Sequence, residues 1–197
     1  MNNNPDFLGM NIQLFQRYGK GHKYPTSRYT HDQIIDQING PMIGIAEQTA
    51  PYAKRSLVHE ETLYAWLRAG KYDLYEPAFE VTVKGEVALQ GYVDGRIARP
   101  APYDAQQLLF YWRNWYAYKF QGLPYDECVE HWDLFGKIPL MDRKDEDVCS
   151  SFGGLCHVVL MKAEGQDIAG VFGGYNPSYW TPSDIGNEPT LRKVNVG

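Results

Sequence analysis

The chain has 197 residues, with 19 Lys or Arg against 24 Asp or Glu, so its formal charge at pH 7 is −5. This length suits one domain, and 44% hydrophobic with 22% charged residues is typical of a folded protein rather than a disordered one. The mildly acidic balance argues against nucleic-acid binding, which needs clustered Lys and Arg, and no apolar run is long enough to cross a membrane.

Residues 1–29 are expected to form an extended arm rather than a packed element. Glycines and prolines are spread through the segment, and its apolar residues, among them Phe7, Leu14 and Phe15, follow neither a helical nor an alternating pattern. Four basic residues stand against one acidic residue, Asp6, which gives the arm a net charge of +3. Such a segment is ordered only where it docks, so we expect an acidic partner surface.

From residue 30 onward, the residues that begin and end helices predict three of them. Thr30 and Gln33 have the spacing of a capping box before an isoleucine-rich run, and Gly40 would end that helix. A second, short helix is expected over 41–48, with Pro at its first position. A third is expected over 56–68, with Ser56 as its cap.

The remaining elements are expected to alternate between hairpins and helices. Residues 78–98 alternate between apolar and polar and predict a β-hairpin. Two helices are expected over 104–120 and 126–136, the first of them apolar almost all round. A second hairpin is expected from a strand over 156–161, a turn, and a strand over 168–175.

Together these elements predict an α+β fold, because helices combine with two antiparallel hairpins and no strand–helix–strand alternation is present. We expect one domain over 30–175, preceded by the arm. The proline-rich tail over 176–197 is expected to be coil.

A thiol site is one candidate for chemistry. Cys128 falls near the start of the expected 126–136 helix, where the helix dipole favours a thiolate nucleophile. His157 at the head of one expected strand and Asn176 just beyond the next could act as base and orienting residue. This arrangement is that of papain-like hydrolases, and the run from His157 to Leu160 resembles the His strand of NlpC/P60-type cell-wall peptidases. The resemblance implies a Cys–His hydrolase.

A zinc site is a further alternative. Cys128 and His131 are one helical turn apart, and Cys149 and Cys156 could complete a tetrahedral set, as in a zinc-stabilised binding module. The spacing of the second pair exceeds the roughly two to four residues of a zinc knuckle. We therefore expect the cysteines to be structural, with neither a metal nor another cofactor.

Aromatic residues make up 14% of the chain, including 15 Tyr and 5 Trp. Tyr and Trp are enriched at protein interfaces because they bury a large area while keeping a polar end. We expect an aromatic docking surface to include Tyr111, Trp115, Tyr118, Tyr179 and Trp180.

With the arm and the tail, these features favour a non-enzymatic interaction or structural protein over a hydrolase. It would belong to a larger assembly, as a viral or phage structural component or an inhibitor. It would bind a protein partner or a second copy of itself. The odd number of cysteines, three, and the lack of a visible secretory signal favour a cytoplasmic or virion-associated protein.

Overall fold

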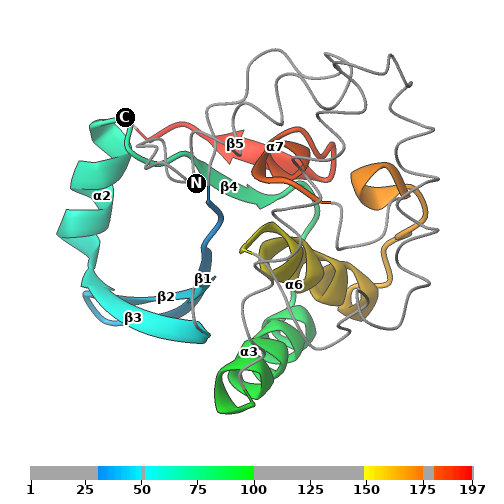
Figure 1. Ribbon diagram of the computed structural model, residues 1–197, viewed down its shortest axis with the longest axis horizontal. Coiled ribbons are helices and arrows are strands. Elements are labelled where there is room, and N and C mark those ends of the chain that lie inside the picture. Colours follow the sequence, from blue (N-terminus) through cyan, green and yellow to red (C-terminus); the bar gives the residue numbers. More distant parts are fainter. Residues whose placement is uncertain (1–30, 50–51, 100–148, 175–179, 197) are drawn as a thin grey trace, which may run out of the picture.

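The structure is a computed structural model that describes residues 31–49, 52–99, 149–174 and 180–196 (Figure 1). Over these residues, helices combine with two antiparallel sheets, which confirms the predicted α+β class. The expected arm over 1–29 and the helices expected over 104–120 and 126–136 lie outside the described residues. Within the described part, no helix has both the length and the apolar character that crossing a membrane requires.

The first part of the described chain is a three-stranded antiparallel sheet. Its strands are β1 (Ile34–Asn39), β2 (Met42–Gln48) and β3 (Ala53–His59), in the order β1-β2-β3. The helices expected over 30–39 and 41–48 are therefore wrong. Asn39 pairs with Met42 and Gly40 has a φ of +58°, so Gly40-Pro41 forms the two-residue turn of a hairpin. The isoleucines of both strands, branched at Cβ, favour this extended backbone over a helix.

Helix α2 (Glu60–Arg68) follows β3 directly and packs on the sheet through Leu63, which contacts Ile43 of β2. The helix ends where the sequence predicted. Its expected start is wrong, because Ser56 lies within β3 rather than at a helix cap.

Helix α3 (Val83–Ala98) replaces the hairpin expected over 78–98. Residues spaced by four along it face one cluster of the core: Leu89, Val93 and Ile97. This helical spacing outweighs the alternation of apolar and polar residues that predicted strands. Gly85 lets the neighbouring helix come close, because a Cβ there would lie 2.8 Å from Leu160 Cδ1.

Helix α6 (Cys149–Ala163) is the central element of the described structure and replaces the strand expected over 156–161. It packs against α3 on one side and contacts β2 and the C-terminal segment (Figure 1). Ten of its residues are buried, so the helix is enclosed on most sides and its sequence shows no helical period. The strand expected over 168–175 is also wrong, because the short 3₁₀ helix η1 (Val171–Gly174) lies there.

The C-terminal segment, expected to be coil, contains helix α7 (Pro182–Gly186) and strand β5 (Leu191–Val194). Strand β5 pairs antiparallel with β4 (Leu74–Pro77), which the sequence did not predict, and makes the second sheet. The coil prediction is wrong here because Pro182 occupies the first turn of α7, where proline is well tolerated.

Candidate active site

The residues first proposed for a hydrolase do not form a described site. Cys128 and Asn176 lie outside the described residues. His157 lies inside helix α6 rather than at the head of a strand, so that placement is wrong. Its Nε2 is 2.8 Å from Thr190 Oγ1, and burial lowers the pKa of its imidazole to about 4. His157 is therefore a neutral, buried histidine at neutral pH.

The aromatic docking surface remains a prediction, because most of its residues lie outside the described chain. Those residues are Phe7, Leu14, Phe15, Tyr111, Trp115, Tyr118 and Tyr179. Trp180 is described, but it is only 4% exposed and its ring centroid is 4.4 Å from that of Phe172. Trp180 thus belongs to the core and offers no exposed aromatic surface here, and the expected assembly role stays a prediction.

The cysteines of the zinc alternative, so far as they are described, are free thiols. Cys149 and Cys156 are both buried and both lie on α6. Burial raises the pKa of the Cys156 thiol well above its usual range. Among the described residues, no group of three or more His, Cys, Asp or Glu side chains could hold a metal ion.

A different cysteine and histidine do come together beside α6. Cys149 is the first described residue of that helix, and His31 lies just before β1. The thiol of Cys149 lies close enough to the imidazole of His31 to raise its pKa. The Nε2 of His31 is 2.8 Å from Oε2 of Glu47, near the end of β2. The imidazole of His31 is therefore hydrogen-bonded to Glu47 and has the thiol of Cys149 as a neighbour.

The hairpin explains why His31 and Glu47 meet. Ile34 of β1 pairs with Ala46 of β2, so the residues just before Ile34 lie opposite Glu47. Gln33 fits the same register, because its Nε2 donates a hydrogen bond of 2.8 Å to Oε2 of Glu47. The turn at one end of the hairpin thus fixes the pairing of side chains at the other.

Glu47 is held as a carboxylate at this site. Burial by itself would raise its pKa, but hydrogen bonds from His31, Gln33 and Lys54 lower the pKa to about 2. The Nζ of Lys54 is 3.2 Å from Oε1, and the side chain of Glu47 is 12% exposed. Glu47 is therefore ionised and fixed in position at neutral pH.

His31 is charged in this environment. Burial alone would lower its pKa, but negative charge on Cys149 and the hydrogen bonds with Cys149 and Glu47 together raise the pKa to about 10. Because Nε2 faces Glu47, the other ring nitrogen, Nδ1, is the one left for the thiol. The imidazolium therefore pairs with the carboxylate of Glu47 and lies beside the thiol of Cys149.

The sequence interpretation missed this set. It placed His31 in a helix, treated Cys149 as structural or as a possible zinc ligand, and did not consider Glu47. The signal that could have found it is Gly40-Pro41, because Gly at the first of two loop positions is typical of a tight hairpin turn. A hairpin centred there brings residues 31–33 opposite Glu47.

Comparison with known proteins gives no family for this chain. No protein-family model, no curated protein and no solved structure matches it. Its function must therefore be inferred from the geometry of its own residues.

Proposed function

We propose that the protein is a cysteine hydrolase or acyltransferase in which Cys149 is the nucleophile, His31 the general acid and base, and Glu47 the orienting residue. The observation that carries this proposal is the hydrogen bond between His31 and the ionised carboxylate of Glu47, with the thiol of Cys149 next to the same imidazole. A nucleophile, a base within reach and a third group that orients the base are the parts that covalent acyl transfer needs.

The reaction follows from the charges on these groups. The thiolate of Cys149 attacks the carbonyl carbon of an ester or amide, so a C–S bond forms and the carbonyl electron pair moves to oxygen. His31 then gives its proton to the leaving alcohol or amine as the bond to carbon breaks, leaving a thioester on Cys149. Water, or another acceptor, gives a proton to neutral His31 and displaces the acyl group from sulfur.

Glu47 acts through His31 and does not touch the substrate. It fixes the ring orientation and stabilises the imidazolium, as the acidic member of a catalytic triad does. We expect the Glu47→Gln variant to lower the acylation rate by about 10²- to 10⁴-fold, with a far smaller change in substrate affinity. A change in KM alone would assign Glu47 to substrate binding instead.

The substrate is unknown, so the test uses a small activated ester, p-nitrophenyl acetate, with the full-length protein. We expect a burst of p-nitrophenol of about one equivalent, the sign of an acyl-enzyme. Mass spectrometry should place the acetyl group on Cys149. The Cys149→Ala and His31→Gln variants should lose the burst, while the Cys156→Ala variant, which removes the other buried thiol of α6, should keep it.

Iodoacetamide labelling provides the second readout. Cys149 should be alkylated much faster than Cys156, and the difference should shrink in the His31→Gln variant. Equal labelling of the two thiols in the native protein, or labelling of Cys149 that is indifferent to His31, would refute the proposal. Circular dichroism of each variant checks that the fold is retained.

A further inference from the structure

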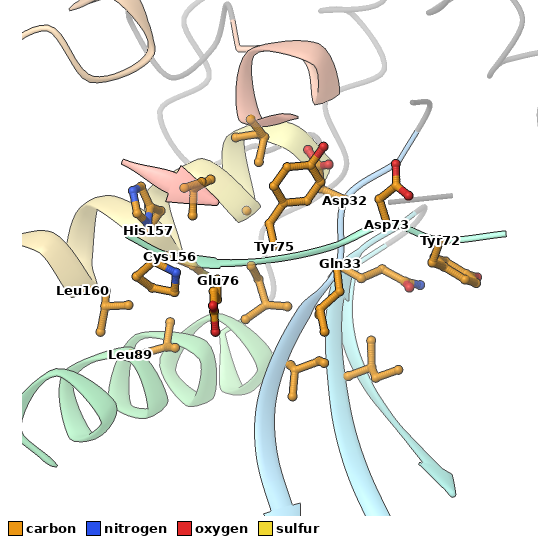
Figure 2. Close-up of a pocket in the computed structure, with 18 of the residues that line it drawn as sticks. Asp32, Gln33, Tyr72, Asp73, Tyr75, Glu76, Leu89, Cys156, His157 and Leu160 are labelled. Atoms are coloured by element: carbon orange, nitrogen blue, oxygen red, sulfur yellow. The ribbon is translucent and has the colours of Figure 1, made fainter. Parts of the chain in front are cut away.

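A cavity of about 260 Å³ lies next to the candidate active site, between the segment that enters β1, strand β4 and helix α6 (Figure 2). Most of its wall is apolar, contributed by residues such as Ile34, Ile45, Leu63, Leu89, Leu160 and Leu191. Figure 2 shows the polar residues of the wall coming from different elements: Asp32 and Gln33 from the β1 side, Glu76 from β4 and His157 from α6.

Asp32 is the unusual member of this wall. It directly follows His31 in the chain, it is only 3% exposed, and neither carboxylate oxygen has a hydrogen-bond partner among the described residues. It rests against α6, because a Cβ placed on Gly153 would lie 3.3 Å from the Cβ of Asp32. Buried carboxylates are nearly always paired, so an unpaired one in a cavity wall indicates a group that a ligand can satisfy.

The charges around the cavity favour a cation. Three carboxylates line it, Asp32, Asp73 and Glu76, and none of the described lining residues is Lys or Arg. Asp73 is 2.8 Å from the Nζ of Lys193, and Glu76 is 2.7 Å from the Nε of Arg192, so these two are neutralised by partners outside the wall. Asp32 is the one of the three that has neither an ion-pair nor a hydrogen-bond partner among the described residues.

Asp32 is ionised at neutral pH although it is buried. Burial is the main cause that raises the pKa of its carboxyl group, from 3.8 to about 6. The charge of His31 lowers this pKa and that of Asp184 raises it, whereas His157, whose own pKa is lowered to about 4 by burial, is uncharged at neutral pH. The wall therefore presents one anionic group within an otherwise apolar surface.

We propose that this cavity binds a small organic cation with an apolar body, whose ammonium group pairs with Asp32. The volume of the cavity limits the size of the apolar part of the ligand. A cavity of about 150 Å³ lined by Leu, Ile and Phe holds benzene, so the larger space here suits an aromatic ring that carries a short aminoalkyl chain. This site does not depend on the proposed hydrolase, because the thiol of Cys149 is not part of the cavity wall.

The test compares two probes that differ in charge and hardly in shape, 2-phenylethylamine and 2-phenylethanol, by calorimetric titration of the full-length protein at pH 7.5. We expect the amine to bind at least about tenfold more tightly than the alcohol, because only the amine can pair with the buried carboxylate. Equal affinities would overturn the proposal and leave an apolar cavity without preference for a cation.

Three variants locate the interaction. Asp32→Asn keeps the shape of the side chain and should abolish the preference for the amine. Glu76→Gln removes one charge from the same wall and should keep the preference, because Glu76 already has a partner. Leu89→Phe narrows the cavity and should weaken both probes. A preference that survives Asp32→Asn, or unchanged binding in Leu89→Phe, would place the amine elsewhere.

The outcome is separable from that of the proposed reaction. The Cys149→Ala variant should bind the amine as tightly as the wild-type protein, whether or not Cys149 proves to be a nucleophile. Loss of amine binding in this variant would contradict an independent site and place the amine at the thiol itself.

Discussion

Replacing Asp32 by Asn should make the protein more stable at neutral pH. The carboxyl group of Asp32 is buried, has no described hydrogen-bond partner, and has its pKa raised from 3.8 to about 6. A raised pKa means that the folded state binds a proton more tightly than the unfolded state. The ionised form therefore weakens folding, and an uncharged amide of the same shape removes that cost.

The size and the pH range of the effect follow from this shift. One pKa unit corresponds to about 1.36 kcal/mol, so a shift of about two units is worth about 3 kcal/mol of unfolding free energy. Below pH 4 the carboxyl group is protonated in both states and resembles the amide. As the pH rises from 4 to 6, the wild-type protein loses this stability, whereas the Asp32→Asn variant does not. The advantage of the variant should be complete at pH 7.

Urea unfolding followed by tryptophan fluorescence, measured between pH 4 and 8, gives the difference between variant and wild type at each pH. Other groups titrate in both proteins, so they cancel from this difference. The matched control is Glu76→Gln, whose carboxylate is 48% exposed and pairs with Arg192, and which should change stability by less than about 1 kcal/mol. A difference for Asp32→Asn that stays constant across the pH range would refute the reasoning.

Two further predictions concern packing and acid stability. Gly154→Ala should destabilise the protein by about 1–3 kcal/mol, because the new Cβ would lie 2.3 Å from Cε3 of Trp180. Gly91→Ala, in open space on α3, should instead stabilise it by about 0.5–1 kcal/mol. Thermal unfolding of the two variants tests this, and equal melting temperatures would contradict it. His157 has its pKa lowered to about 4 by burial, so it contributes stability above pH 6.5 that is lost as the pH falls to 4, about 3 kcal/mol in all. The His157→Gln variant should lose that acid-side dependence in the same urea titration, and a slope that persists would assign it to other groups.

The α+β class was predictable from the sequence, but the positions of most elements were not. Thr30 and Gln33 satisfy the local rule for a helix cap, yet Gly40-Pro41 satisfies the local rule for a hairpin turn, and the two rules conflict over the residues between them. Pairing along β1 and β2, together with burial of Ile43 and Ile45, decides in favour of the hairpin. Local signals cannot weigh those contacts, because they form between strands.

The prediction of a strand where helix α6 lies was wrong for a different physical reason. A helix that is buried on most sides has no polar face, so the run from Val158 to Met161 is typical of a strand as much as of a helix. The two wrong predictions, a helix over 30–39 and a strand over 156–161, are the reason the candidate site was missed. Once His31 was placed in a helix and helix α6 was predicted as a strand, nothing in the sequence brought His31 and Cys149 together, since they meet only when α6 packs beside the hairpin.

The pairing of β4 with β5 also has a consequence for how the chain is synthesised. Pro77 pairs with Leu191, so more than half of the chain separates the two strands. At about 5–20 residues per second, β4 emerges from the ribosome on the order of ten seconds before its partner. Leu191 also forms part of the cavity wall, so the pocket beside Asp32 stays open to water and to chaperones throughout that interval. The hairpin that carries His31 and Glu47 can form early, but Cys149 and the last wall of the cavity arrive late, and neither site can work on a nascent chain.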